Sequence, residues 1–201
     1  MSPLFNSRAA ESSESLSNHD KSALLKIARQ SLVERIVHDR RWQPDASAGI
    51  LAVRRGAFVT LHVRGKLRGC VGQVETNKSL AETVARCAIS AAREDDRFNP
   101  VQPGEVAQLE IEISVLSPPK QITPSEIVIG KHGLIIECGP FRGLLLPQVA
   151  AERHWTAEKF LSETCLKAGL PSEAWKSAET QIFGFTAEVF SEHEAPSESS
   201  K

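Results

Sequence analysis

The sequence has few of the residues that nucleic-acid-binding proteins use. Its 201 residues include no tyrosine, and aromatic residues make up only 5% of the chain. The formal net charge is −1 and the isoelectric point is near 6.6. Proteins that bind single strands stack bases on aromatic side chains and neutralise phosphates with a surplus of Lys and Arg. A nucleic-acid partner is therefore not favoured.

Long hydrophobic runs are also absent. No apolar run approaches the roughly 18 residues that a membrane-spanning helix requires. The first residues, MSPLFNSRAAESSES, lack the basic-then-apolar order of a secretory signal. We therefore expect a cytoplasmic protein without a membrane partner.

Cysteine is present but not in metal-binding patterns. The four cysteines stand at positions 70, 87, 138 and 165, without a CxxC pair or a Cys/His cluster at zinc spacing. We expect free thiols, no metal site and no cofactor that the sequence identifies. Three of these residues have apolar or helical neighbours, which is typical of small core residues. Cys70 differs, because Gly69 precedes it and Gly72 follows closely.

Composition divides the chain into three parts. Residues 1–17 and 191–201 are rich in Ser and Glu, which predicts disordered tails around a folded domain at residues 18–190. Within that domain, apolar spacing predicts helices near 20–38, 78–94 and 157–168, and strands near 57–63, 67–74, 109–115, 134–138, 144–146 and 181–190. Antiparallel hairpins mixed with separate helices indicate an α+β fold, with helices flanking an antiparallel sheet.

The segment KLRGCVGQV at residues 66–74 forms the second half of a predicted hairpin. Its apolar residues share a face with those of residues 57–63 only if the connecting loop has an odd number of residues. We therefore expect a three-residue turn at 64–66. This register gathers four polar side chains on the other face: Thr60, His62, Arg68 and Cys70.

This group suggests a thiol site. A reactive thiolate needs a positive or basic neighbour, and Arg68 and His62 are placed to supply one. Gly69 and Gly72 would let a ligand or another chain approach the backbone. The alternative is that Cys70 is a small packing residue and the glycines mark a bulge. The residues alone leave both readings open.

Four further polar residues are binding candidates because they stand at the ends of predicted elements: Asp96, Arg97, His132 and Gln148. For Asp96 and Arg97 a self-satisfied ion-pair cluster is the favoured interpretation, because the preceding helix carries Arg93 and Glu94. His132 precedes a glycine turn, and Gln148 follows Pro147 at a strand end. Both are also consistent with ordinary turn residues.

The segment LRGCVG closely resembles the LRGCIG signature of the AMMECR family. Further matching segments follow in order across residues 20–190: SAAREDDRFNPV, LEIEISVLSPP, IGKHGLII, GLLLPQVA and FLSETCLKAGL. Val71 replaces the usual isoleucine, which exchanges one β-branched residue for another. The resemblance implies a two-lobed α+β fold with a cleft between the lobes, and LRGCVG as the functional segment.

In prokaryotes, such proteins resemble component A of the AmmeMemoRadiSam system. The resemblance therefore implies a Memo-type protein and a radical S-adenosylmethionine protein as partners, but it supplies no reaction. The favoured hypothesis is a ligand- or substrate-handling component, which would be thiol-dependent through Cys70 if it is an enzyme. A non-catalytic protein-interaction module is the alternative. A nucleic-acid-binding regulator is less favoured.

Overall fold

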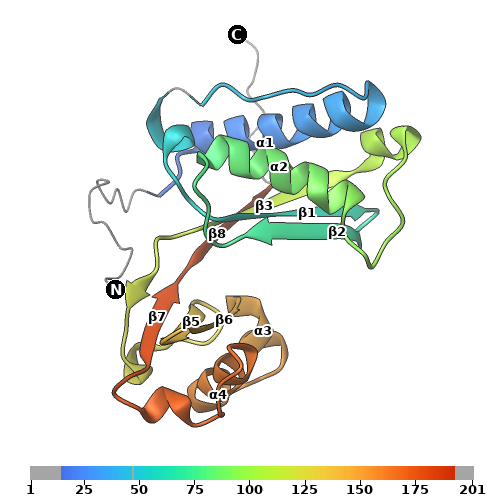
Figure 1. Ribbon diagram of the computed structural model, residues 1–201. Helices are drawn as coiled ribbons and strands as arrows, with labels where there is room; N and C mark the ends of the chain where they lie inside the picture. Colours follow the sequence, from blue (N-terminus) through green and yellow to red (C-terminus); the bar gives the residue numbers. More distant parts are fainter. Residues whose placement is uncertain (1–14, 47, 193–201) are drawn as a thin grey trace.

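In the computed structural model, which describes residues 15–46 and 48–192, the chain forms two four-stranded antiparallel sheets (Figure 1). Sheet A has the strand order β2-β1-β3-β8, and sheet B has the order β4-β7-β5-β6. The strands are β1 (Ala57–Val63), β2 (Lys66–Gln73), β3 (Glu110–Leu116), β4 (Lys120–Gln121), β5 (Gly133–Cys138), β6 (Phe141–Leu145), β7 (Gln181–Phe185) and β8 (Ala187–Ser191). The expected α+β class is confirmed.

Four α-helices accompany these sheets: α1 (Asn18–Leu32), α2 (Leu80–Arg93), α3 (Pro147–Glu152) and α4 (Ala157–Lys167). Five short helical segments connect the elements: η1 (Val33–Val37), η2 (Gly49–Ala52), η3 (Pro103–Gln108), η4 (Pro124–Glu126) and η5 (Ala174–Lys176). None of the helices in the described ranges has the length and apolar character to cross a membrane.

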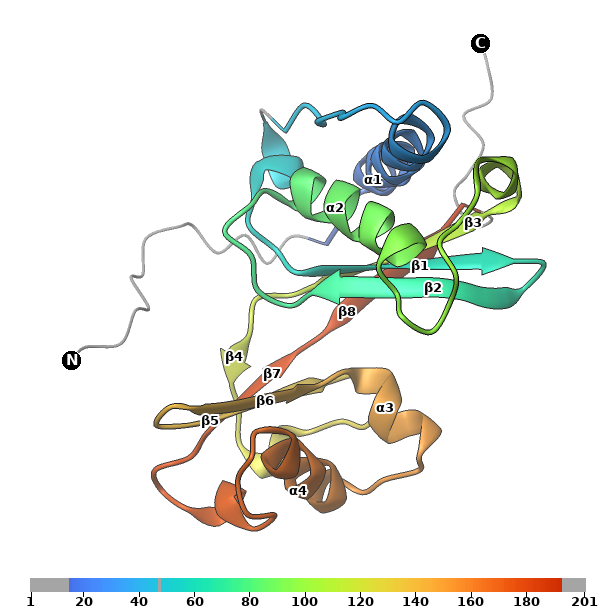
Figure 2. The same cartoon turned by 45° about the vertical axis from the view of Figure 1, so that its right-hand side comes forward.

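Helices α1 and α2 lie side by side on one face of sheet A (Figures 1 and 2). The strands turn alternate residues toward these helices, so Val59, Leu61, Ile111 and Ile113 are almost completely buried. Helix α2 contributes small residues to the same core, which lets its axis approach the sheet. The opposite face of sheet A is turned toward sheet B.

Sheet B has its own core beneath α4. Phe160 and Leu161 of this helix are fully buried against Leu134 and Ile136 of β5. Thr156 caps the helix through its side chain. A third cluster, built around Leu116, Ile135 and Phe185, joins residues of the two sheets.

The predicted strand at 181–190 is in fact two strands that belong to different sheets. Strand β7 pairs in sheet B and β8 pairs in sheet A, so the chain crosses from one sheet to the other at Thr186 (Figure 1). Ser117 makes the reverse crossing beside it. Its N–H donates to the Thr186 carbonyl at 2.8 Å, and its hydroxyl accepts from the Thr186 N–H at 2.9 Å. The two crossings thus hold each other in place.

Both domain boundaries lie outside the expected range of 18–190. Leu16 is only 4% exposed, and Ser17 forms a reciprocal capping box with Asp20 at the start of α1. At the other end, the Glu192 carboxylate accepts hydrogen bonds from Arg29. These residues therefore belong to the folded unit. The remainder of each predicted tail, residues 1–14 and 193–201, lies outside the described residues.

The turn of the first hairpin is also corrected. Arg64 and Gly65 form a two-residue turn, with φ angles of 52° and 71°. The extra residue that we expected in the turn is instead Arg68, which forms a β-bulge in β2. Leu61 pairs with Gly69, whereas the next residue, His62, pairs with Leu67. From Gly69 onward, β2 pairs with β1 in the expected register. Between the turn and the bulge, His62 lies opposite Leu67 rather than beside Arg68.

Candidate functional site

Cys70 lies on β2, at the edge of sheet A, directly opposite Thr60. The Thr60 hydroxyl donates a hydrogen bond to the Cys70 sulfur, with a distance of 3.2 Å between Oγ1 and Sγ. The neighbouring Gly69 faces α2, so the alternation along the strand turns Cys70 to the other face. Cys70 is half-buried there, whereas Cys87 and Cys165 are fully buried.

Packing explains both glycines of the LRGCVG segment. A Cβ atom on Gly69 would lie 2.0 Å from the carbonyl oxygen of Ala91 in α2. A Cβ atom on Gly72 would lie 2.2 Å from the ring of Phe58 on the adjacent strand. The glycines therefore let α2 and an aromatic ring lie against β2. The half-buried Cys70 thus lies between two closely packed positions.

Asp95 binds the backbone of the LRGCVG segment, whereas the sequence had pointed to its neighbour Asp96. Its Oδ2 atom accepts the Cys70 backbone N–H at 2.8 Å. Arg97 donates to the same carboxylate from Nε at 2.9 Å and from a terminal nitrogen at 2.8 Å. The hydrogen bonds from Arg97, together with that from Cys70, keep the pKa of Asp95 well below its ordinary value. Asp96 is exposed.

Arg97 and the Cys70 backbone N–H share the carboxylate of Asp95. Asp95 is the main group that raises the pKa of the Arg97 guanidinium, and Cys70 adds to the effect. The Arg97 side chain is 57% exposed, so solvent reaches its charge. The positive neighbour expected for Cys70 is therefore Arg97, which comes from the loop after α2 rather than from β2 itself.

Arg68 forms an ion pair with Glu105, whereas the sequence suggested it as the positive neighbour of Cys70. Its Nε atom and one terminal nitrogen bind the two oxygens of Glu105 at 3.0 and 3.1 Å, and its other terminal nitrogen donates to the Asn99 carbonyl at 2.9 Å. This two-pronged pair is the strongest form of an Arg–carboxylate contact. The hydrogen bonds from Arg68 lower the pKa of Glu105. Glu105 thus binds the guanidinium that we expected to serve as the positive neighbour of Cys70.

The other candidate residues lie apart from this group. His62 lines a small cavity of about 250 Å³ with Glu110 and Glu112. His132 accepts the Val128 N–H at its Nδ1 atom, 3.2 Å away, and lies beside a different cavity. Gln148 is exposed at the start of α3. Four residues therefore form the site around the thiol, which we call the Cys70 cluster: Thr60, Cys70, Asp95 and Arg97.

All four cysteines are free thiols. Within residues 15–46 and 48–192, no group of three or more His, Cys, Asp or Glu side chains is placed to hold a metal ion. The chemistry that the Cys70 cluster offers is that of a half-buried thiol with a hydroxyl donor and a nearby cation.

The two coupled antiparallel sheets and the thiol segment at the edge of one sheet define a particular class of α+β protein. Residues 25–190 match the AMMECR1 family model, and the chain belongs to this family. A protein of Methanothermobacter thermautotrophicus is 44% identical over 185 residues, covering 88% of this chain and 96% of that protein. Protein MK0488 of Methanopyrus kandleri is 41% identical over 191 residues, with coverage of 90% and 92%.

A solved structure shares the fold. The crystal structure of PH0010 from Pyrococcus horikoshii matches this chain with a TM-score of 0.71 and 39% sequence identity. The match covers 86% of this chain and 91% of that one. PH0010 is described as an uncharacterized protein, so these similarities establish the family and the fold without naming a reaction.

Proposed function

We propose that this protein is a ligand- or substrate-handling component that uses the Cys70 thiol as its contact group. The observation that carries the proposal is the hydrogen bond from Thr60 to the Cys70 sulfur, on the face of sheet A that no helix of the pair α1 and α2 covers. Such a bond orients the sulfur. If the protein is an enzyme, its reaction is thiol-dependent.

Each residue of the Cys70 cluster has a separate role in this proposal. Arg97 supplies a solvent-accessible positive charge for an anionic ligand. Asp95 fixes Arg97 and the Cys70 backbone at the same time. Arg68 acts indirectly, because its bond to Glu105 fastens the segment after α2 against β2. Arg68 is thus a positioning residue.

The proposed setting follows from the family resemblance. We propose that the protein works with a Memo-type protein and a radical S-adenosylmethionine protein in the cytoplasm, where reducing conditions keep its thiols free. Mixing the three purified proteins of one organism and measuring sedimentation tests this setting. A complex that forms with wild type at micromolar concentration supports it, and three independently sedimenting species would oppose it.

The alternative is a non-catalytic interaction module in which β2 accepts a strand from another protein. β2 is an edge strand, which is the position that such partners use. However, the Asp95 carboxylate already takes the outward N–H of Cys70. A new strand would have to displace this contact, so the geometry favours the thiol proposal over strand addition.

Alkylation of the native protein with iodoacetamide at pH 7, followed by peptide mapping, tests the thiol proposal. Cys138 is the matched control, because it is also half-buried and free. We expect Cys70 to be labelled first and Cys87 to resist, since burial raises the pKa of Cys87 to about 11. Labelling of Cys70 that is no faster than that of Cys138 would overturn the proposal.

A further inference from the structure

A second cavity, of about 690 Å³, opens where the two sheets meet. Its walls come from the end of β3, from β4, β7 and β8, and from the turn before β5. Cys70 lies on the opposite edge strand of sheet A, so this cavity is separate from the Cys70 cluster. Its volume lies within the range of roughly 300–1,000 Å³ that is typical of small-molecule sites.

The ionisable side chains in the wall of the cavity are mainly basic. The residues with basic side chains are Arg55, Lys120, Lys131 and His132. Arg55 is only 8% exposed, whereas Lys120 and Lys131 are exposed and neither of the two makes an ion pair with a described residue. His132 accepts a hydrogen bond at Nδ1, which places the proton of the neutral ring on Nε2 as a donor. Lys120, Lys131 and His132 can each donate to an anion.

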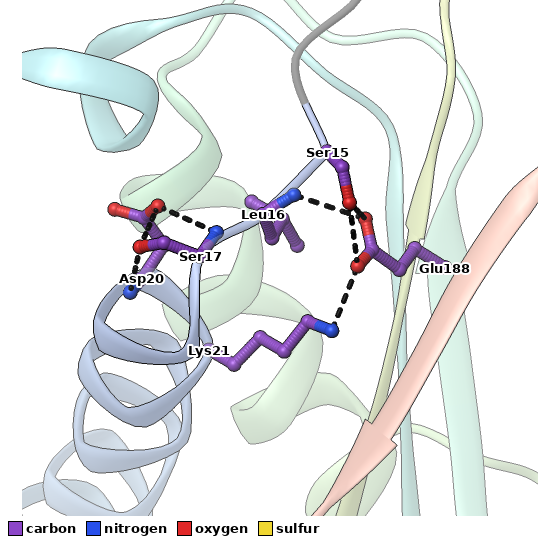
Figure 3. A network of polar contacts seen from close by, with 6 residues as sticks. All are labelled: Ser15, Leu16, Ser17, Asp20, Lys21 and Glu188. Carbon is purple, nitrogen blue, oxygen red and sulfur yellow. Dashed lines mark hydrogen bonds and ion pairs between the residues drawn. The ribbon is translucent and has the colours of Figure 1, made fainter.

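The acidic side chain among the described lining residues, Glu188, is already engaged (Figure 3). Its carboxylate binds the Lys21 ammonium at 2.8 Å and accepts the Leu16 N–H at 3.1 Å. Ser15 donates to it as well, at 3.3 Å. Burial opposes ionisation of Glu188, but these donors outweigh it and lower the pKa of the group. The negative charge of Glu188 is therefore paired with Lys21 of α1, and Glu188 is not paired with the basic side chains across the cavity.

Another part of the wall is apolar. Val115, Pro118, Ile122 and Phe185 line the same cavity. An inorganic ion alone would leave this surface in contact with water. A molecule that carries both a charged head and a hydrocarbon or aromatic body would cover it and gain the free energy of apolar burial. The basic and the apolar residues of the cavity together favour an amphiphilic anion as the ligand.

We propose that this cavity binds a small organic anion with a carboxylate or phosphate head and an apolar body. Lys120, Lys131 and His132 hold the head, and Ile122 and Phe185 contact the body. The site does not depend on the reactivity of Cys70. It would make the junction between the sheets a second ligand-binding region of the protein.

A fluorescence titration with 8-anilinonaphthalene-1-sulfonate, an aromatic anion, tests the proposal on the full chain. Wild type should bind one equivalent saturably, and Lys120→Glu or Lys131→Glu should each weaken binding about tenfold by reversing a charge near the head. Lys167→Glu is the matched control, since it makes the same charge change at an exposed position on α4. It should leave binding unchanged. Thermal melting confirms that all variants are folded.

Competition then identifies the head group. Displacement of the probe by phenyl phosphate alone assigns a phosphate, and displacement by benzoate alone assigns a carboxylate. Displacement by both shows that the site accepts either head. Binding that is absent in wild type, equal in the two cavity variants and the control, or insensitive to both competitors would overturn the proposal.

Discussion

The Cys70 backbone N–H donates a hydrogen bond to the Asp95 carboxylate, with a distance of 2.8 Å between donor and acceptor. The two residues are 25 positions apart, on the edge strand β2 and in the loop after α2. Through this contact the loop caps the strand edge and brings Arg97 close to the thiol. The arrangement of the Cys70 cluster depends on it.

Replacing Asp95 should therefore loosen both the loop and the thiol segment. Asp95→Ala leaves the Cys70 N–H and the Arg97 guanidinium without their acceptor, which should lower the free energy of unfolding by roughly 1–3 kcal/mol. Asp96→Ala is the control, because the Asp96 side chain is exposed. Urea denaturation at pH 7 measures both variants. Equal stabilities for the two would show that the contact does not hold the loop.

The same carboxylate should make stability depend on pH. The pKa of Asp95 is lowered in the folded state, chiefly by hydrogen bonds from Arg97, so the ionised form stabilises the fold. This contribution is fully present above the unfolded pKa of about 3.9 and is lost as the pH falls toward the lower folded value. The stability difference between wild type and Asp95→Asn should therefore shrink from pH 7 to pH 3. A difference that stays constant would contradict the assignment.

The Arg68–Glu105 pair should act as a unit that fastens the segment after α2. Arg68→Ala and Glu105→Ala should each destabilise the protein by about 1 kcal/mol, and the double variant should lose little more than either one. A double-mutant cycle in urea measures this coupling. Strictly additive losses would mean that the two groups contribute independently and that Arg68 remains available for a ligand.

The two glycines of the segment should differ in their tolerance of a methyl group. Gly69→Ala places a Cβ atom against the backbone of α2, which cannot move locally, and should cost roughly 3 kcal/mol. Gly72→Ala meets the Phe58 ring, a side chain that can turn aside, and should cost less. Gly104→Ala is the control, because no atom lies within 4 Å of its added Cβ. Thermal melts rank the three, and a neutral Gly69→Ala would contradict the close packing of α2.

Apolar periodicity was enough to predict most of the elements, because the strands and helices of both cores repeat their buried residues at regular spacing. Predictions from apolar periodicity were wrong where two different structures produce the same apolar pattern. A three-residue turn and a two-residue turn with a bulge give the same register at Cys70, so parity could not separate them. The alternation of side chains also continues through Thr186. The sequence therefore predicted one strand where β7 and β8 belong to two different sheets.

The candidate site was only partly predictable for a different reason. Thr60 and Cys70 are neighbours across one hairpin, so local register brought them together. Asp95 reaches the segment through the packing of α2 on sheet A, and nothing in the local sequence distinguishes it from Asp96. Glu105 likewise meets Arg68 through a long-range contact. A contact of this kind appears only once the helix is placed on the sheet.

The most direct test of the account is the rate of iodoacetamide labelling at Cys70 in wild type, Thr60→Val and Arg97→Gln at pH 7, with Cys138 in each protein as the internal reference. Thr60→Val removes the hydroxyl that orients the sulfur, and Arg97→Gln removes the positive charge that Asp95 holds beside the Cys70 backbone. We expect Cys70 to react faster than Cys138 in wild type, and we expect both substitutions to reduce this advantage. Equal rates at the two cysteines in wild type, or an advantage that neither substitution changes, would contradict the account.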